Sequence, residues 1–405
     1  MADTSTSTGP GGRPGPLVAP GPALASAYRA RYARTEQLPG FGEDAQRRLR
    51  AARVLVVGAG GLGSAVLPLL AGAGFGTIGI VDDDSVELSN LPRQTIHRER
   101  DLGRPKTASA ADAIRAIDAG IDVRVFPERL TSANALGILD GFDLVLDGSD
   151  NFPTRYLVDD AALLTGLPVV WGAVHRFGGQ AGLSWAQHGP HYRDLFPEPP
   201  EPGSVPSCAE AGVLPSVCGV IGSLMVSEAI KVVTGEGDLL LGRVLVHDAL
   251  RGSFRELPYA ADPHAEPVTE LIDYELFCGV APAQGAQAQE TPAREAPAAT
   301  SVSPADLAAR LAAGQPHILL DVREPWEADI AELPGSLLVP LDVVVRDAPG
   351  VAERLGEDPL VIVCHHGMRA ETARKLLAAA GAPGVVLEGG IDAWSRQVDP
   401  SLPRY

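Results

Sequence analysis

The sequence predicts an α/β protein in which a doubly wound, Rossmann-like and mostly parallel sheet domain precedes a smaller α/β domain. Three observations predict this fold. Apolar runs of strand length alternate with helical patterns along residues 53–171, the first run ends in a glycine-rich turn, and residues 281–300 form an Ala/Pro/Gln-rich stretch without apolar periodicity. Strands that alternate with helices form parallel sheets, with binding sites at the carboxyl ends of the strands. The low-complexity stretch cannot build a core and is expected to be a flexible linker.

Composition and charge limit the possible functions. The 405 residues include 33 Lys and Arg against 51 Asp and Glu, a formal net charge of −18, which argues against a nucleic acid partner. The longest apolar run, residues 66–81, is interrupted by glycines, so we expect no membrane span. Asp3 and several prolines argue against a secretory signal, and the four cysteines include no Cys-x-x-Cys pair. We therefore expect a cytoplasmic protein with reduced thiols.

Each element follows from its hydrophobic pattern. Continuous runs rich in Val, Ile and Leu are typical of buried parallel strands, whereas apolar residues three or four apart are typical of helices. In the large domain these patterns predict helices at 25–51, 64–73, 105–117, 131–139 and 153–165 and strands at 54–57, 77–81, 121–126, 144–147 and 168–171. In the small domain they predict helices at 303–313, 370–380 and 391–396 and strands at 317–321, 361–363 and 385–387. The expected parts are a disordered tail (1–24), a large domain (25–280), a linker (281–300) and a small domain (301–405).

The turn after the first strand has the composition of a nucleotide site. Gly58, Gly60 and Gly63 permit a tight turn, a close approach of phosphate and close packing of the helix on the strand. The next helix begins with free N–H groups and the positive end of its dipole. Asp82 follows the second strand, where a carboxylate can hold a ribose hydroxyl. An ordinary tight turn, or the NAD site of a dehydrogenase, would have the same signature.

The residues after Asp82 favour ATP over NAD. Ser89, Asn90, Arg93 and Lys106 place polar groups and two cations beyond the ribose carboxylate. Cations suit a triphosphate, because charge moves between its oxygens when phosphorus is attacked. A cation at the start of a helix is disfavoured by the dipole, so Lys106 is better explained by a ligand role than by solvation. A surface salt bridge is the alternative for Arg93.

A second strand end carries Asp147-Gly-Ser-Asp150-Asn151. Asp150 could hold Mg²⁺ against the phosphates of ATP, because carboxylate oxygens are ligands that Mg²⁺ prefers. Asp or Asn before Pro153 is also good helix-capping chemistry. Both roles remain open.

These residues resemble the MoeB/ThiF family, relatives of ubiquitin-activating enzymes, over residues 25–280. The resemblance implies adenylation of the C-terminal glycine of a ubiquitin-like sulfur-carrier protein that ends in Gly-Gly. It implies that Gly61, Asp82, Ser89 to Arg93, Lys106, Asp150 and Asn151 surround ATP, and that the enzyme is a homodimer in which Arg34 reaches the partner's phosphates. The motifs are Arg31-Tyr-Ala-Arg34, Gly58-Ala-Gly-Gly-Leu-Gly63, Leu88-Ser-Asn-Leu-Pro-Arg-Gln94, Gly103-Arg-Pro-Lys106, Asp147-Gly-Ser-Asp-Asn151 and Pro206-Ser-Cys208-Ala-Glu-Ala-Gly212.

One departure concerns zinc. Many members of this family carry two Cys-x-x-Cys pairs that hold a structural zinc. This sequence has His191-Tyr-Arg-Asp194 at the first position and only Cys278 at the second. Three of four thiolates are absent, so we expect no structural zinc. Packing or dimer contacts would then have to hold this region.

The small domain places a cysteine in an anion-binding loop. Cys364-His-His-Gly367-Met-Arg369 lies between a strand and a helix, so its N–H groups are expected to form a cradle around the thiol. The cradle and Arg369 would lower the pKa of Cys364, with His365 or His366 as further candidates for this effect. A buried apolar cysteine is the alternative.

This domain resembles rhodanese over residues 301–400, which implies that Cys364 carries a persulfide. The matching motifs are Asp321-Val-Arg-Glu-Pro-Trp-Glu327, Pro334-Gly-Ser336, the cysteine loop and Glu388-Gly-Gly-Ile-Asp-Ala-Trp394. Ala370 stands where the family has serine. In the large domain, Cys208 could by resemblance attack the acyl group or resolve an acyl persulfide, whereas Cys218 lies in an apolar helix and is expected in the core.

The combined interpretation is an adenylyltransferase fused to a sulfurtransferase. ATP activates the carboxylate of the carrier, and the Cys364 persulfide replaces the adenylate to give a thiocarboxylate. Three alternatives remain: a dehydrogenase, an activator that only forms a thioester on Cys208, and a scaffold. The identity of the carrier stays open, as does the sulfur donor, thiosulfate or a cysteine desulfurase.

Overall fold

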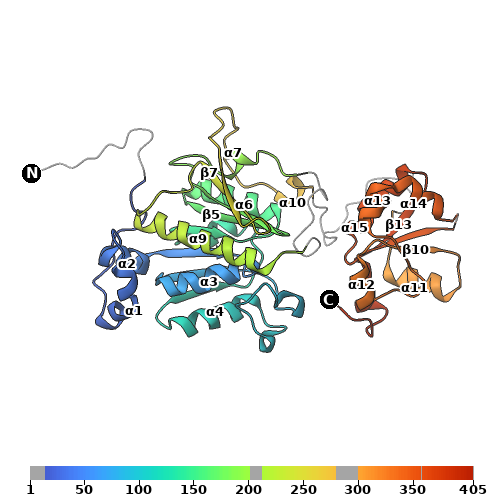
Figure 1. The fold of residues 1–405 in the computed structure, drawn as a ribbon, viewed down its shortest axis with the longest axis horizontal. Helices are drawn as coiled ribbons and strands as arrows, with labels where there is room; N and C mark the ends of the chain where they lie inside the picture. Colours follow the sequence, from blue (N-terminus) through green and yellow to red (C-terminus); the bar gives the residue numbers. More distant parts are fainter. Residues whose placement is uncertain (1–13, 201–211, 280–299, 357, 405) are drawn as a thin grey trace, which may run out of the picture. The chain divides into compact units, whose positions relative to one another are not determined.

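The computed structural model describes residues 14–200, 212–279, 300–356 and 358–404 (Figure 1). The chain separates into two compact units, Met1–Ala283 and Gln284–Tyr405, and each is described by itself. Most of the expected tail and nearly all of the expected linker lie outside the described residues, as does Cys208.

The large unit is built on one sheet of eight strands in the order β3-β2-β1-β4-β5-β6-β7-β8. The first five strands in this order are parallel and the remaining pairings are antiparallel. This architecture confirms the predicted doubly wound, mostly parallel fold. The strands are β1 (Arg53–Val57), β2 (Thr77–Val81), β3 (Asp122–Phe126), β4 (Leu144–Asp147), β5 (Val169–His175), β6 (Gly178–Ser184), β7 (Arg243–Asp248) and β8 (Ser253–Pro258).

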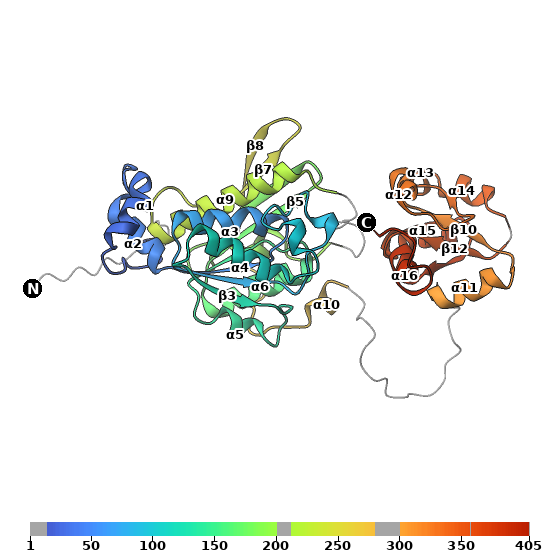
Figure 2. The ribbon, with the colours of Figure 1, turned by 90° about the horizontal axis from the view of Figure 1, so that it is seen from below.

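Helices cover both faces of this sheet (Figures 1 and 2). The pleat of β1 shows why both faces are apolar: Val54 and Val56 join the core under α3, α4 and α9, whereas Leu55 and Val57 join the core under α5 and α6. The helices are α1 (Ser26–Glu36), α2 (Gly42–Ala51), α3 (Gly61–Ala73), η1 (Leu88–Asn90), η2 (Glu99–Asp101), α4 (Lys106–Ile117), α5 (Ala135–Leu139), α6 (Phe152–Thr165), α7 (Tyr192–Leu195), α9 (Pro215–Thr234) and α10 (Tyr274–Phe277).

Two sequence predictions of secondary structure were wrong. The single helix expected over residues 25–51 is two helices, because Pro39 and Gly40, with a positive φ of 81°, interrupt it. The helix expected over 131–139 spans only Ala135–Leu139, because the Asn134 side chain accepts a hydrogen bond from the Thr131 amide and caps a turn there.

Helix α9 is long and apolar enough to cross a membrane by length and composition, a feature that the sequence analysis passed over. In this fold 61% of its apolar window is buried. Its buried residues, including Val217, Ile221 and Met225, belong to the main core of the large unit. It is therefore placed as a core helix of this unit.

The small unit has a parallel five-stranded sheet in the order β11-β10-β12-β13-β9. Two apolar cores lie on its two faces. Its strands are β9 (Ser301–Val302), β10 (Ile318–Asp321), β11 (Leu337–Leu338), β12 (Leu360–Val363) and β13 (Gly384–Leu387). Its helices are α11 (Pro304–Ala312), α12 (Pro325–Ile330), α13 (Leu341–Arg346), α14 (Ala348–Arg354), α15 (Met368–Ala379) and α16 (Gly390–Gln397).

Candidate active sites

Strand register brings the predicted nucleotide residues to one edge of the large sheet. In β1, Val57 lies opposite Val81 of β2 on one side and Asp147 of β4 on the other. The glycine turn, Asp82 and the loop after β4 therefore leave the sheet side by side. The strand order reverses between β1 and β4, the position at which doubly wound sheets bind ligands.

The glycines of the turn have different structural requirements. Gly58 has a φ of 90°, and a Cβ atom on Gly63 would lie 2.0 Å from the Gly58 carbonyl oxygen, so both positions need glycine. A Cβ atom on Gly61 would lie 2.9 Å from the Cys218 sulfur, which packs beneath the turn as a buried side chain. Gly60 has no such neighbour within 3.4 Å, which is compatible with a space left for phosphate.

Asp82 braces the glycine turn. Its Oδ2 accepts a hydrogen bond of 2.7 Å from the Ala59 amide, and its Oδ1 accepts one of 2.9 Å from the Asp84 amide. Burial raises the pKa of Asp82, while Lys106 and the Ala59 amide act to lower it. The carboxylate thus has a structural role in addition to the expected contact with ribose.

Lys106 is the first residue of α4 and is only 5% exposed. Its Nζ lies 2.7 Å from Asp84 Oδ2, and its amide donates to the Asp84 carbonyl. The carboxylate offsets the unfavourable position of a cation at the start of a helix. The sequence did not lead us to predict Asp84 as the partner of Lys106. Its position two residues after Asp82, at the end of the same strand, indicates that its carboxylate lies near the predicted nucleotide site. Among the described residues, Asp82, Asp83 and Asp84 are the acidic group whose oxygens lie within 4.8 Å of one another.

The residues around η1 are ordered by local contacts. Arg93 donates from Nη1 to the Ser89 carbonyl at 2.9 Å, a backbone contact in place of the surface salt bridge that was the alternative for this residue. Asn90 Oδ1 accepts a hydrogen bond from the Glu87 amide and caps the short helix. Ser89 itself is exposed. The predicted roles of these three residues at ATP stay predictions.

At the end of β4, both capping and exposure are seen. Asn151 is the N-cap of α6, with its Oδ1 accepting from the Thr154 amide at 2.9 Å, which is the capping alternative for this residue. Asp150 is exposed, so its carboxylate is accessible to a cation, but its role with Mg²⁺ stays a prediction. Arg34 is exposed on α1, and its contact with a second subunit stays a prediction.

The region that the sequence analysis compared with a zinc site is held by polar and aromatic contacts. His191 Nδ1 lies 2.7 Å from Asp159 Oδ2, and Arg193 donates to both oxygens of Asp160 at 2.7 Å. Tyr274 donates from its hydroxyl to Asp160 at 2.6 Å. The Arg193 guanidinium also lies over two aromatic rings, 5.0 Å from that of Tyr156 and 4.8 Å from that of Phe277. We call Arg193, Asp160 and Tyr274 the polar clasp.

The donors at this position do not fit a zinc ion. Asp194 accepts hydrogen bonds from the His191 and Asp262 amides. Burial raises the pKa of Cys278 to about 11, which disfavours the thiolate that zinc would need. Within the described residues His191, Asp194 and Cys278 do not form a group with ligand atoms within 4.8 Å. The absence of zinc stays a prediction.

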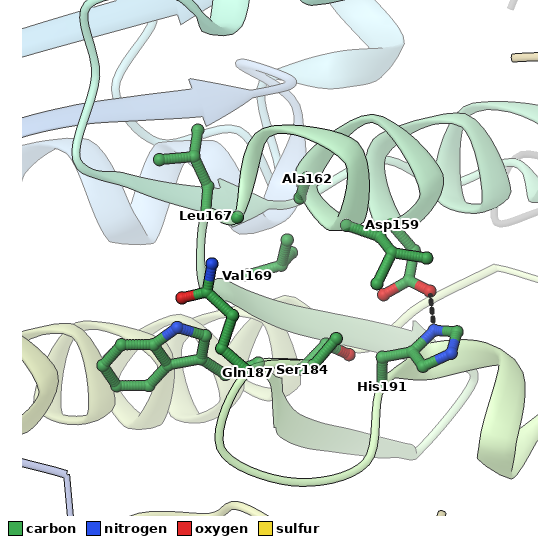
Figure 3. Close-up of a pocket in the computed structure, with 11 residues that line it drawn as sticks. Asp159, Ala162, Leu167, Val169, Ser184, Gln187 and His191 are labelled. Atoms are coloured by element: carbon green, nitrogen blue, oxygen red, sulfur yellow. Dashed lines mark hydrogen bonds and ion pairs between the residues drawn. The ribbon is translucent and has the colours of Figure 1, made fainter. Parts of the chain in front are cut away.

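A pocket of about 180 Å³ lies beside this region (Figure 3). Its described lining comes from α6, β5, β6 and the following loop, and not from the glycine turn. Figure 3 shows the His191 ring hydrogen-bonded to Asp159 at one end of the pocket, away from Leu167. The pocket is therefore separate from the predicted nucleotide site.

Removing the arginine of the polar clasp is expected to destabilise the large unit without any role for metal. Arg193→Met leaves the buried Asp160 carboxylate without its cation and is expected to cost about 3 kcal/mol. Arg251→Met, which breaks an exposed pair with Asp248, is the matched control and is expected to change stability by less than about 0.5 kcal/mol. Thermal unfolding of the full chain, with and without EDTA, measures both. Stoichiometric zinc in the purified protein, with a melting temperature that EDTA lowers, would contradict this prediction.

In the small unit, Cys364 follows β12 and is 1% exposed. Its sulfur accepts hydrogen bonds from the Gly367 amide at 3.0 Å and the Ala370 amide at 3.4 Å. A Cβ atom on Gly390 would lie 2.3 Å from the Cys364 carbonyl oxygen, so the Gly-Gly motif at the start of α16 lets the loop pack closely. The predicted backbone cradle is thus present. Ala370 lacks the hydroxyl of a serine, but its backbone amide still donates a hydrogen bond to the Cys364 sulfur.

The expectation of a lowered thiol pKa was wrong for the free thiol. Burial raises the pKa of Cys364, and this outweighs the Ala370 and Gly367 amides and the Arg369 guanidinium, which act to lower it. Burial also lowers the pKa of His365 to about 4, so that ring is neutral near pH 7 and adds no positive charge. The N–H groups of the loop therefore contact the sulfur without help from a charged His365.

Arg369 is itself paired. Its guanidinium donates to both oxygens of the buried Glu327 at 2.6 and 2.7 Å. Arg323, which is fully buried, pairs in turn with Asp321 and donates to the Ala331 carbonyl. The Arg369 pair explains Glu327 as a support of the cysteine loop, and the Arg323 pair with Asp321 explains the Asp-Val-Arg motif as a support of the segment that carries Glu327. Sequence spacing did not reveal either pair.

Comparison with known proteins decides against two of the three alternative functions, the dehydrogenase and the scaffold. Residues 32–268 match the ThiF family and residues 303–397 match the rhodanese-like domain. The chain belongs to the ThiF family. A relative from Mycobacterium tuberculosis, the probable adenylyltransferase/sulfurtransferase MoeZ, is 46% identical over 96% of this chain and 98% of its own length. The adenylyltransferase and sulfurtransferase MOCS3 of Mus musculus is 38% identical over 97% of this chain and 90% of its own.

These matches confirm both resemblances and identify an enzyme that is an adenylyltransferase and a sulfurtransferase. A sulfur carrier protein adenylyltransferase of Thermus thermophilus is 50% identical over 62% of this chain and 96% of its own length. Among solved structures, E. coli MccB aligns with a TM-score of 0.53 at 20% identity over 62% of this chain and 75% of that chain, which supports the fold. As a ThiF-type adenylyltransferase the enzyme uses ATP, and the dehydrogenase alternative is set aside.

Proposed function

We propose that this enzyme adenylates the C-terminal glycine of a ubiquitin-like sulfur-carrier protein and then converts it to a thiocarboxylate with sulfur from Cys364. The observation that supports the proposal is that one chain holds both chemical parts. The large unit gathers a glycine turn, a carboxylate and the buried Lys106 at one sheet edge, and the small unit holds a thiol in a backbone cradle.

The adenylation step needs charge stabilisation rather than a base. A carboxylate is ionised near neutral pH and can attack the α-phosphorus of ATP directly, with pyrophosphate leaving. Lys106 and Arg93 would offset the charge on the phosphates, and Arg34 would do so from the partner subunit of a homodimer. Asp150 would hold Mg²⁺, which neutralises phosphate charge when bound. Asp82 would orient the ribose.

The sulfur step follows from acyl transfer chemistry. The outer sulfur of a Cys364 persulfide attacks the acyl adenylate, the carbonyl–oxygen bond breaks and AMP leaves, so that carrier and enzyme are joined by an acyl disulfide. A second thiolate then attacks Cys364 Sγ, which releases the thiocarboxylate and leaves a disulfide between the two cysteines. Cys208 is our candidate for this thiolate. The disulfide must be reduced by an external thiol before the next cycle.

A sulfur donor completes the proposal. A donor of sulfane sulfur, thiosulfate or the persulfide of a cysteine desulfurase, must reload Cys364. A linker over residues 281–300 would raise the effective concentration of the small domain near the acyl adenylate. We propose that the enzyme acts in the cytoplasm.

Intact mass of the carrier tests the whole proposal. Candidate carriers ending in Gly-Gly are incubated with the enzyme, ATP, Mg²⁺ and thiosulfate, with a cysteine desulfurase and cysteine as the second donor arm. The expected product is heavier than the carrier by the difference between sulfur and oxygen, and it forms only with ATP. A product that remains a thioester on Cys208, with no thiocarboxylate from either donor, would support the ubiquitin-like alternative instead.

A further inference from the structure

His97 is a buried histidine that neither half of the proposed chemistry uses. It is 3% exposed and lies in the loop between η1 and η2. Its Nε2 lies 3.0 Å from the Ala59 carbonyl oxygen, within the glycine turn, and its Nδ1 lies 2.9 Å from the Ser109 hydroxyl on α4. One ring thus joins the turn to the helix that begins with Lys106.

The two contacts fix the state of the ring. A carbonyl only accepts hydrogen bonds, so Nε2 must carry the proton that it donates to Ala59. Burial lowers the pKa of His97, which favours the neutral ring. In the neutral ring Nδ1 is an acceptor, and the Ser109 hydroxyl can donate to it. The geometry therefore defines a single tautomer, held between two elements that lie far apart in the sequence.

Both backbone polar groups of Ala59 are hydrogen-bonded to side chains from outside the turn. Its amide donates to Asp82 Oδ2 at 2.7 Å, and its carbonyl accepts from His97. The glycines on either side of Ala59 allow many backbone conformations, so the turn alone does not determine where its N–H groups point. Contacts from outside the turn can fix the directions of these N–H groups before a ligand binds. Such preorganisation strengthens binding because less conformational freedom is lost on binding.

We propose that His97 is a positioning residue for the nucleotide: by bridging the Ala59 carbonyl and the Ser109 hydroxyl it fixes the glycine turn relative to helix α4 and Lys106. The inference rests on the proposed nucleotide site at this sheet edge. A histidine that only fills the core would affect stability, whereas a positioning residue must also affect the affinity for ATP.

The test measures binding of α,β-methylene ATP to the full-length protein by calorimetry, together with the melting temperature. His97→Ala is expected to weaken binding about tenfold, the ratio that one lost hydrogen bond of about 1.4 kcal/mol produces. His97→Gln, whose amide can still donate to the Ala59 carbonyl, is expected to stay within about threefold of wild type. The control is His247→Ala, which removes another buried histidine from β7, remote in sequence from the turn, and should leave affinity unchanged.

The outcomes separate the two hypotheses. Failure of the wild type to bind α,β-methylene ATP overturns the nucleotide site itself. Binding by the wild type with equal affinity in His97→Ala overturns the role of His97, as does an equal loss of affinity in the control. Where His97→Ala does not fold, Ser109→Ala replaces it, because this change removes the partner of Nδ1. A loss of about threefold then supports the inference, and an unchanged affinity overturns it.

Discussion

Cys364→Ala is expected to abolish formation of the carrier thiocarboxylate while carrier-dependent exchange between ATP and pyrophosphate continues. The sulfur atom that would carry the persulfide is removed, so sulfur transfer should fall by roughly 10³-fold or more, to background. Adenylation is expected to persist because its residues lie in the other compact unit. Intact mass of the carrier and a pyrophosphate exchange assay measure the two steps separately.

A second cysteine supplies the control for this experiment. Cys278 is also free and buried, with 6% exposure, but it belongs to the large unit, whereas the loop cradle belongs to the small unit. Cys278→Ala should keep both activities. Persistent thiocarboxylate in Cys364→Ala would show that sulfur reaches the acyl adenylate by another route, and simultaneous loss of pyrophosphate exchange would show that the two units do not divide the chemistry as proposed.

Lys106→Met is expected to lower kcat/KM for adenylation by roughly 10²- to 10³-fold, the usual cost of removing one preorganised group that stabilises charge in a transition state. The structural reason is that Lys106 is a buried cation at the predicted nucleotide edge of the sheet, where the Asp84 carboxylate holds it. Asp84 is largely exposed, so water can solvate it after the substitution and the protein should remain folded. Carrier-dependent pyrophosphate exchange measures the loss.

Helix α4 provides a matched control for charge. Arg115 lies on the same helix, and its only described pair is an exposed contact of 3.9 Å with Asp112. Arg115→Met removes one positive charge from α4 and should leave exchange within about twofold of wild type. Retention of more than a third of wild-type exchange in Lys106→Met would contradict a role for this cation at the phosphates.

Local patterns in the sequence were sufficient to predict both sites in outline. Gly58 and Gly63 have backbone requirements that only glycine meets, and Cys364 lies in a short loop between a strand and a helix whose amides face the sulfur. Parallel strands such as β1, β4 and β12 were predictable because both of their faces are buried, which gives continuous apolar runs. The parallel strands β9 and β11 have two residues each and were not predicted. The antiparallel strands β6 to β8 were missed. The burial pattern of β7 is mixed and its apolar run, Val244-Leu-Val246, is short, β8 is largely exposed, and β6 contains three glycines.

The sequence by itself determined which residues could do chemistry and which strand ends carry them, because a turn, a cap or a loop cradle involves only neighbours along the chain. Tertiary structure alone decided which partners those groups contact and how burial shifts their pKa values. The partners of Lys106, His97 and Arg369 lie 22, 38 and 42 residues away, and their pairing depends on strand order and helix packing. The pKa of Cys364 was likewise decided by burial, which a local pattern of polar neighbours does not measure.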